Sequence, residues 1–296
     1  MEVWKFRSTS TAQNYGQALV DNIDKDGTPD VFIGSGSSKV YRLNGKTGEI
    51  VWEYVLPFGI VSSLSYFIAD LDNDGMKEFI FGNTISHPIR VAALSTAKNI
   101  KDRLLWARNV SGDFFQGGLS YFRNNKGEIR IVAGTRDAPY SKGSVNILDR
   151  GGNRVVPEII GFDVCNNRPT YMDVNNDGEL DVLMGSHGYY GAKYSNSLTA
   201  IDSQTGKIIW STPVEVDTGW LNFPILDIDG NGKKEIIIPT ESNFSIYSSN
   251  GQKQGEIKGA GEFQASFQDS NGNTTLLYTN HTETLVNKTE LKTKLI

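Results

Sequence analysis

Four short segments of the chain carry oxygen-bearing side chains at one shared spacing, and that spacing suits a hard metal cation. Asp, Asn or Glu stands at positions 1, 3, 5 and 9 of each segment, and Gly stands at position 6. Ca²⁺ takes six to eight oxygen ligands, mostly carboxylates and carbonyls, so such a loop can wrap around it. The glycine allows the left-handed backbone that a tight curl requires. These four acidic loops are residues 22–30, 70–78, 173–181 and 227–235.

Each acidic loop is predicted to add the backbone carbonyl of its position 7 to the side-chain ligands. Asp, Asn and Gly also favour tight turns without a metal, but four copies at regular intervals favour ion binding. An ion wrapped on all sides has no open coordination position, so its predicted role is structural. The predicted metal ligands are Asn22, Asp24, Asp26, Thr28, Asp30, Asp70, Asp72, Asp74, Met76, Glu78, Asp173, Asn175, Asp177, Glu179, Asp181, Asp227, Asp229, Asn231, Lys233 and Glu235.

The acidic loops recur with a period of about 50 residues. Residues 22 and 70 begin the first two loops and lie 48 positions apart, while residues 173 and 227 begin the last two and lie 54 apart. The middle gap, from 70 to 173, spans about two periods. Copies that have lost most of their carboxylates lie at 122–130 and 267–275, so the chain contains six units.

Each unit is expected to contain four strands. The loops lead into short apolar runs at 31–34, 79–82, 131–134, 182–185 and 236–239, which are typical of strands covered on both faces. A strand–turn–strand pattern that ends in Trp follows, at 40–52 and again at 198–210. Trp4 and Trp106 stand at the equivalent place, and we expect these tryptophans to lock neighbouring units together. Four strands in about 50 residues is the size of one propeller blade.

The predicted fold is therefore all-β: a six-bladed β-propeller of four-stranded antiparallel blades in a single domain, residues 1–296. The strand around Trp4 is expected to complete the last blade and close the ring. Alternatively, residues 290–296 form that fourth strand, and Trp4 belongs to an extra outer strand or to the relic of a seventh blade. The approximate blades are 10–60, 61–112, 113–164, 165–215, 216–260, and 261–296 together with 1–9.

The loop pattern resembles the FG-GAP and VCBS repeats of integrin-α-like propellers and of related bacterial and fungal propellers, over essentially the whole chain. The resemblance implies about four structural Ca²⁺ ions, one in the hairpin between the first and second strands of blades 1, 2, 4 and 5. Asn22 replaces the usual first Asp, so the site in blade 1 is expected to be weaker. Blades 3 and 6 are expected to bind no ion.

Composition and charge restrict the partners and the location. The net charge is −5 with the acidity concentrated in the acidic loops, which suits cations better than nucleic acid. No apolar run reaches the length of a membrane span, so no membrane insertion is expected. Cys165 is the only cysteine, so no internal disulfide can form. Calcium is abundant outside cells, and together with the resemblance this predicts an extracellular or cell-surface location, although the start of the chain carries no recognisable signal peptide.

A ligand is expected on the face opposite the acidic loops, where the second–third and fourth–first strand connections lie. Asp163 and Arg168 lie in fourth–first connections, and aromatic residues stand close to Arg and Asp in the longer loops. Such side chains suit a sugar or a peptide, although some of the rings could instead fill the core between blades. The predicted ligand-binding residues are Arg136, Asp137, Tyr140, His187, Tyr189, Tyr190, Tyr194 and Trp220.

These observations favour an extracellular recognition or adhesion module for a glycan or protein ligand rather than an enzyme. One alternative is a polysaccharide lyase or hydrolase on the same scaffold. His187, Tyr189, Arg136 and Lys142 are the candidates for its base and its cation. No nucleophile motif, recognisable acid pair or phosphate-binding loop supports catalysis. The other alternative is a structural domain of a larger surface assembly.

Overall fold

The computed structural model is all-β, and its described part contains no helix. Twenty-three strands form six antiparallel sheets, each a simple meander in chain order. No helix long and apolar enough to cross a membrane occurs among the residues described. The structure describes residues 3–8, 18–36, 38–84, 87–113, 115, 118–136, 143–164, 167–188, 192–215, 223–240, 243–258, 262–268, 274–280 and 283–291.

Five sheets have four strands and the last has three. The first two sheets are β1 (Leu19–Asp21), β2 (Asp30–Ser35), β3 (Lys39–Asn44) and β4 (Ile50–Val55), then β5 (Ile60–Ala69), β6 (Glu78–Thr84), β7 (Arg90–Leu94) and β8 (Leu104–Asn109). The third and fourth are β9 (Leu119–Arg123), β10 (Ile129–Gly134), β11 (Gly143–Leu148) and β12 (Ile159–Phe162), then β13 (Thr170–Met172), β14 (Asp181–Ser186), β15 (Ser197–Ile201) and β16 (Ile208–Pro213). The fifth and sixth are β17 (Ile225–Leu226), β18 (Glu235–Pro239), β19 (Asn243–Tyr247) and β20 (Lys253–Lys258), then β21 (Glu262–Gln268), β22 (Thr274–Asn280) and β23 (Glu283–Leu291).

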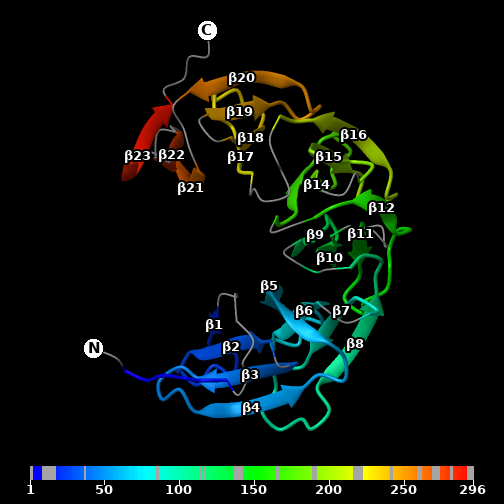
Figure 1. Cartoon of the computed structure of the whole chain (residues 1–296), viewed down its shortest axis with the longest axis vertical. Helices are drawn as coiled ribbons and strands as arrows, with labels where there is room; N and C mark the ends of the chain where they lie inside the picture. The colour runs from blue at the N-terminus through cyan, green and yellow to red at the C-terminus, as the bar shows by residue number, and fades with distance from the viewer. Residues whose placement is uncertain are drawn as a thin grey trace.

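The six sheets follow one another around an arc with a hollow centre (Figure 1). This arrangement is a β-propeller, as the repeats predict, and the sheets are its blades 1 to 6 in chain order. The arc in Figure 1 is open between the sheet β21–β23 and the N-terminal segment. Six blades and closure of the ring by the N-terminal strand stay predictions.

The hydrophobic core lies between the faces of neighbouring blades. Phe32 and Trp52 of blade 1 pack with Phe79 and Phe81 of blade 2 in one buried cluster. Three further clusters join blade 2 to blade 3, blade 3 to blade 4, and blade 4 to blade 5 in the same way. The middle strands of a blade are therefore buried on both faces, which explains their continuous apolar runs.

Tryptophan side chains connect successive blades, as predicted. The Nε1 of Trp52 donates a hydrogen bond to the carbonyl of Thr96 in blade 2, and that of Trp106 donates to Arg150 in blade 3. Trp210 of blade 4 makes the equivalent bond to Ser249 of blade 5, at 2.9 Å. Each acceptor lies in the connection between the third and fourth strands of the next blade.

The N-terminal segment packs on the face of blade 1 that is turned away from blade 2. Residues 3–8 form no strand, but Trp4 and Phe6 pack against the buried side chains of Tyr41 and Leu43. The last sheet lacks a fourth strand among the described residues. Residues 290 and 291 belong to its third strand, β23, so they do not begin a separate fourth strand.

Candidate metal centres and ligand face

All four acidic loops lie where they were predicted, between the first and second strands of blades 1, 2, 4 and 5. We call them hairpins 1, 2, 4 and 5. Position 9 begins the second strand, and its carboxylate accepts a hydrogen bond from the backbone N–H of position 2. The four bonds are Ile23 to Asp30 at 3.2 Å, Leu71 to Glu78 at 2.8 Å, Val174 to Asp181 at 3.1 Å and Ile228 to Glu235 at 2.9 Å.

The backbone of hairpins 2, 4 and 5 curls around the carboxylate of position 1. Gly75 has a φ of +89° and donates its N–H to Asp70 Oδ2 at 3.0 Å. The glycines at position 6 of hairpins 4 and 5 donate to Asp173 at 3.0 Å and to Asp227 at 2.8 Å. The carboxylates are thereby held by the loop itself before any ion is bound.

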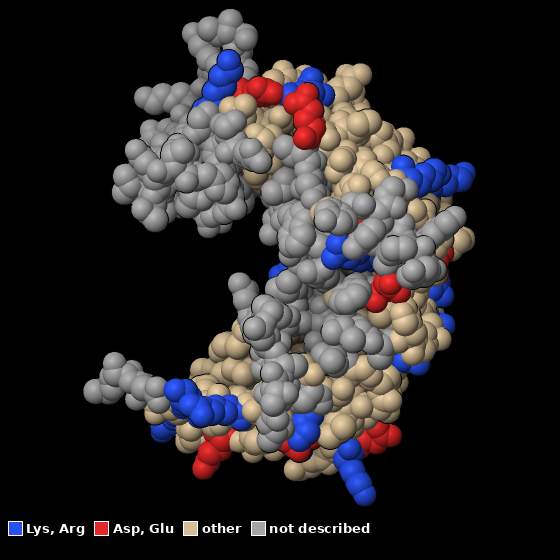
Figure 2. Space-filling view, viewed as in Figure 1, with Lys and Arg blue, Asp and Glu red and all other residues tan. Residues whose placement is uncertain are grey.

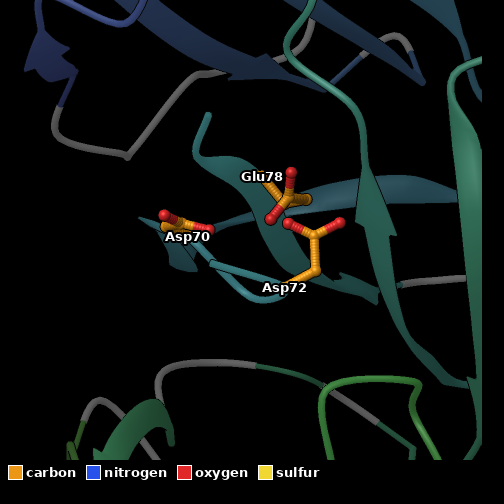
Figure 3. A group of neighbouring side chains, drawn as sticks. All are labelled: Asp70, Asp72 and Glu78. Carbon is orange, nitrogen blue, oxygen red and sulfur yellow. The ribbon is translucent and has the colours of Figure 1, made fainter. Parts of the chain in front are cut away.

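Three carboxylates converge in hairpin 2 and three in hairpin 5. Oxygen atoms of Asp70, Asp72 and Glu78 lie within 4.8 Å of one another, and Figure 3 shows the side chains turned toward a common space. Oδ1 of Asp70 is buried and accepts no hydrogen bond from the described residues. Three carboxylates that converge in this way, one with a buried oxygen that lacks a donor, match the oxygen ligands that Ca²⁺ prefers. The equivalent residues of hairpin 5 are Asp227, Asp229 and Glu235.

The carboxyl pKa values show how unfavourable these groupings are without a cation. Burial, with the nearby Asp72, raises the pKa of Glu78 to about 7. Burial and the negative charge of Asp177 raise the pKa of Asp181 to about 6 in hairpin 4. The pKa of Glu235 is raised for the same reasons. A divalent cation among these oxygens would favour the ionised forms and remove the repulsion.

Hairpin 4, like hairpin 5, has an amide side chain in place of one acid. Asn175 replaces one acid and donates from Nδ2 to Asp177 Oδ2 at 3.1 Å. The side chain of Glu179, at position 7, points away from the loop and accepts a hydrogen bond from the backbone N–H of Asn125 in blade 3, at 3.1 Å. Its backbone carbonyl alone remains a candidate ligand, as position 7 predicts.

Basic side chains from outside the loop contact the carboxylates of hairpin 1. The guanidinium of Arg42 contacts Asp24 at 2.6 Å and Asp30 at 2.7 Å, and Lys98 Nζ contacts Asp24 at 2.5 Å. Burial opposes ionisation of Asp24, but hydrogen bonds from Lys98 and Arg42 lower its pKa to about 2. The pKa shift of Asp24 is therefore opposite in direction to those of Glu78, Asp181 and Glu235.

Residues 122–130 of blade 3, the degenerate copy that has lost most of its carboxylates, close their turn with a neutral amide and an ion pair. Asn124 Oδ1 accepts the N–H groups of Lys126 at 3.1 Å and of Glu128 at 2.9 Å. Arg130 stands at position 9 and pairs with Glu128 at 2.7 Å. The turn of the copy in blade 6, residues 269–273, lies outside the described residues.

The opposite face brings together three titratable side chains from blades 3 and 4. Asp163 is fully buried; its Oδ1 lies 3.6 Å from Arg136 Nε and its Oδ2 lies 3.7 Å from His187 Nδ1. The backbone N–H of His187 also donates to the carbonyl of Asp163 at 2.7 Å. The sequence indicates the loop positions of these residues, but their convergence depends on how blade 3 meets blade 4.

The ring of Tyr194 packs in the core between blades. It lies 4.6 Å from the ring of Phe162, and Lys193 Nζ lies 4.8 Å from its centre. Phe115 is likewise buried, at 1% exposure, against blade 2. Tyr194 and Phe115 therefore fill the core between blades, which is the alternative role considered for the aromatic residues of this face. The predicted ligand-binding residues Asp137, Tyr140, Tyr189, Tyr190 and Trp220 lie outside the described residues, as does Lys142.

A cavity of about 640 Å³ opens between blades 2 and 3, on the face opposite the hairpins. Ile89, Val110 and Ile160 form apolar walls, and His87 and Ser111 add polar groups. His87 Nε2 lies 3.0 Å from Asp113 Oδ1. The sequence did not indicate this cavity, because its walls come from three separate connections and strands.

Charged side chains elsewhere on the surface are mixed. In the view of Figure 2, basic and acidic residues of the described part alternate along the outer rim of the arc. Neither sign forms a broad continuous area there.

Residues 22–81, which contain hairpins 1 and 2, match the model of the FG-GAP-like repeat. The chain contains an FG-GAP-like repeat. This finding confirms the resemblance that the acidic loops indicated. A comparison with curated proteins finds no match.

Solved structures with the same fold have different activities. Rhamnogalacturonan lyase YesW matches with a TM-score of 0.58 and 16% identity, over 95% of this chain and 54% of that one. Bap1, a biofilm matrix protein of V. cholerae, matches with a TM-score of 0.56 and 17% identity, over 86% and 44%. BBS1N, solved in complex with ARL6DN, matches with a TM-score of 0.55 and 10% identity, over 90% and 77%. This chain thus spans about half of the first two structures, and identities this low show the fold alone.

Proposed function

We propose that this FG-GAP-repeat propeller is a calcium-stabilised extracellular recognition module that binds a glycan or protein ligand on the face opposite its hairpins. The observation that carries the calcium proposal is the convergence of Asp70, Asp72 and Glu78 within 4.8 Å, together with the equivalent group in hairpin 5. Three carboxylates at this separation repel one another in the absence of a cation.

Calcium would act as a structural part of each hairpin. The side chains of positions 1, 3, 5 and 9 would hold the ion with the carbonyl of position 7. An ion present at ten times its Kd adds about 1.4 kcal/mol per site to the free energy of unfolding. Three or four such sites are comparable with a large part of the stability of a typical domain. Millimolar free calcium outside cells supports an extracellular or surface location.

The ligand face offers both apolar and polar contacts. The cavity beside Ile89, Val110 and Ile160 combines apolar walls with His87 and Ser111, a combination that suits a sugar ring or a peptide side chain. The similar structures include a biofilm matrix protein and a propeller in complex with a protein, which agrees with a surface or binding role.

Binding to arrayed glycans and surface proteins, with calcium and with EGTA, tests the proposal. Ile160→Glu places a charge in the cavity, and Ile160 is already 37% exposed, so the fold should tolerate it. We expect this variant to lose ligand binding. The control is Leu105→Glu, because Leu105 is 53% exposed on the outer strand β8 and lies away from the cavity. Equal binding by the two variants would exclude the cavity as the ligand site.

Calcium dependence is measured separately by thermal unfolding. We expect EGTA to lower the Tm and calcium to restore it. An unchanged Tm, with no bound calcium detected by titration calorimetry, would contradict the calcium proposal without deciding the ligand site.

One arrangement favours a second candidate, a polysaccharide lyase. Arg136 and His187 lie on either side of the buried Asp163, so a cation and a base occur at one place. A lyase needs both groups near the bond that it breaks. Unsaturated products, detected by their ultraviolet absorbance after incubation with acidic polysaccharides, would establish this activity. Absence of both products and binding would favour a structural domain of a surface assembly.

A further inference from the structure

We propose that hairpin 1 holds no calcium, because Arg42 and Lys98 occupy the place of the ion as built-in cations. Blade 1 is then joined to blade 2 independently of calcium. The proposal concerns the contrast between hairpin 1 and hairpins 2, 4 and 5, and that contrast rests on the proposed calcium function. The contacts within hairpin 1 are observed in the structure and do not depend on that function.

Arg42 is the central group of hairpin 1. Its side chain is 1% exposed, and it points from the middle of β3 to the carboxylates of the loop. Its Nη2 lies 2.6 Å from Asp24 Oδ2 and 2.7 Å from Asp30 Oδ2, and its Nε lies 2.7 Å from Asp30 Oδ1. Both oxygens of Asp30 are thus bound by one guanidinium, in the bidentate geometry that gives arginine pairs their strength.

Blade 2 supplies further cations to the same loop. Lys98 lies 2.5 Å from Asp24 Oδ2 and 3.6 Å from Asp26 Oδ2. Lys77, from hairpin 2, pairs with Asp21, the carboxylate next to Asn22. Each acidic side chain from position 21 to position 30 therefore has a basic partner.

The position of Lys98 depends on an enlarged connection in blade 2. The third and fourth strands of blade 2 are joined by residues 95–103, and Ser95 N–H donates to the carbonyl of Arg103 at 2.9 Å. The equivalent turn of blade 3 closes within five residues, by a 2.8 Å bond from Asp149 N–H to Asn153. The longer loop also presents the Thr96 carbonyl, which accepts Arg42 Nη1 at 3.0 Å and Trp52 Nε1 at 3.2 Å.

Arg42 has no basic equivalent in blades 2 to 5. In blade 1 it stands opposite Phe32 on the second strand. The register of sheets 2 to 5 assigns its position to Ala93, Ile147, Ala200 and Ile246. In the last sheet the position is taken by Lys288, in the copy that has lost most of its carboxylates. The small or apolar side chains of blades 2 to 5 bring no positive charge to the hairpins beside them. Arg42 of blade 1 and the enlarged loop of blade 2 therefore both bring positive charge to hairpin 1.

The ligand set that remains in hairpin 1 is too small for calcium. Asn22 supplies no charge at position 1. Oδ1 of Asp24 is a buried oxygen of this loop that accepts no hydrogen bond from the described residues. Ca²⁺ needs six to eight oxygens, and it would be repelled by the buried guanidinium at the same place. The FG-GAP-like match begins at this very loop, so the repeat is kept there while the ion is replaced.

Hydrogen exchange measured by mass spectrometry on the full chain tests the proposal. We expect EGTA to increase exchange in 70–78, 173–181 and 227–235 and to leave 22–30 unchanged. In EGTA, Arg42→Ala should increase exchange in 22–30 by about a hundredfold or more, because it leaves Asp30 and Asp24 buried without their main partner. The control is Lys39→Ala, which removes an exposed ion pair with Glu53 from the same strand.

A matched pair of milder variants tests which hairpins bind a calcium ion. Asp26 and Asp74 occupy position 5 of hairpins 1 and 2, and both are exposed. Calorimetric titration with calcium should give one ion fewer for Asp74→Ala than for the unchanged protein, and the same number for Asp26→Ala. These variants keep the proposal testable if Arg42→Ala fails to fold.

The outcomes separate the two proposals. Calcium-dependent protection of 22–30, loss of one ion in Asp26→Ala, or unchanged exchange of 22–30 in Arg42→Ala would each overturn the inference about hairpin 1. If calcium binds to no hairpin, the proposed calcium function fails, and the exchange of Arg42→Ala in EGTA still decides whether Arg42 holds hairpin 1.

Discussion

The indole of Trp106 in blade 2 lies directly against Gly152 in blade 3. A Cβ atom added to Gly152 would stand 2.5 Å from the ring, and the Nε1 of Trp106 donates a 2.9 Å hydrogen bond to Arg150 in the same turn. Gly251 faces Trp210 in the same way. The contact joins adjacent blades through one ring, one carbonyl and one glycine.

A methyl group at Gly152 should therefore disrupt the joint between blades 2 and 3. Gly152→Ala is expected to lower the free energy of unfolding by about 2–4 kcal/mol, from the positive φ of +74° and from the clash with Trp106. Gly127→Ala is the control in the same blade, because Gly127 has a φ of +77° with nothing within 4 Å of an added Cβ. Urea unfolding should show a loss of only about 1 kcal/mol for the control. Equal losses would mean that the contact with the ring contributes nothing.

Trp4 makes the same contact with blade 1 that Trp106 makes with blade 3. Its Nε1 donates to Gly45 at 2.9 Å, and its ring faces Gly48. Residues 3–8 therefore lie where the fourth strand of a preceding blade would lie. In the predicted closed ring, that preceding blade is blade 6. Deletion of residues 1–8 should increase hydrogen exchange in β23 as well as in blade 1. An effect confined to blade 1 would refute closure of the ring by this segment.

Neutralising Glu78 should have opposite effects with and without calcium. Burial and neighbouring carboxylates raise the pKa of Glu78 to about 7. At pH 8 the side chain is therefore mostly ionised in the ion-free fold, and this ionisation costs stability relative to the unfolded chain. Glu78→Gln keeps an acceptor for the N–H of Leu71, and in EGTA it should raise the free energy of unfolding by about 1–2 kcal/mol. In calcium it should lower the stability, because a ligand is lost. Thermal unfolding under both conditions measures the two effects.

The control for this substitution is Glu128→Gln in the degenerate turn of blade 3. Glu128 is exposed and pairs with Arg130, so its substitution should give the same small change in both conditions. A lower stability of Glu78→Gln in EGTA would contradict the repulsion inferred for hairpin 2.

Glu158 is expected to make the joint between blades 2 and 3 sensitive to acid. Burial alone would raise its pKa, but hydrogen bonds from the Ser111 N–H and from Asn146 and Ser144, with the charge of Arg154, lower it below the usual value. A lowered pKa adds stability above about pH 4.5, and that stability is lost as the pH falls through the folded-state value. Glu158→Gln should therefore destabilise the protein by about 1–2 kcal/mol at pH 7, and by less below pH 4.

Urea unfolding at pH 7 and at pH 3.5 measures this difference. The comparison is with Glu53→Gln, which alters an exposed ion pair of β4 with Lys39. A penalty for Glu158→Gln that does not change with pH would mean that hydrogen bonding, and not ionisation, is what this site requires.

The repeat spacing by itself determines much of the architecture. Asp, Gly and apolar residues recur at fixed intervals, so each blade forms its hairpin and its buried strands from local sequence. The positions of the four acidic loops between first and second strands followed directly. The backbone bonds to Asp30, Glu78, Asp181 and Glu235 are equally local, because they span seven residues.

Contacts between blades were decided only by the tertiary structure. Arg42 and Lys98 lie 56 positions apart and meet at Asp24, and Asp163 meets Arg136 and His187 across two blades. Spacing reveals which residues a loop contains, but the charge that surrounds a loop depends on which side chains the next blade turns toward it. For that reason the same acidic motif is surrounded by cations in blade 1 and by other carboxylates in blade 2.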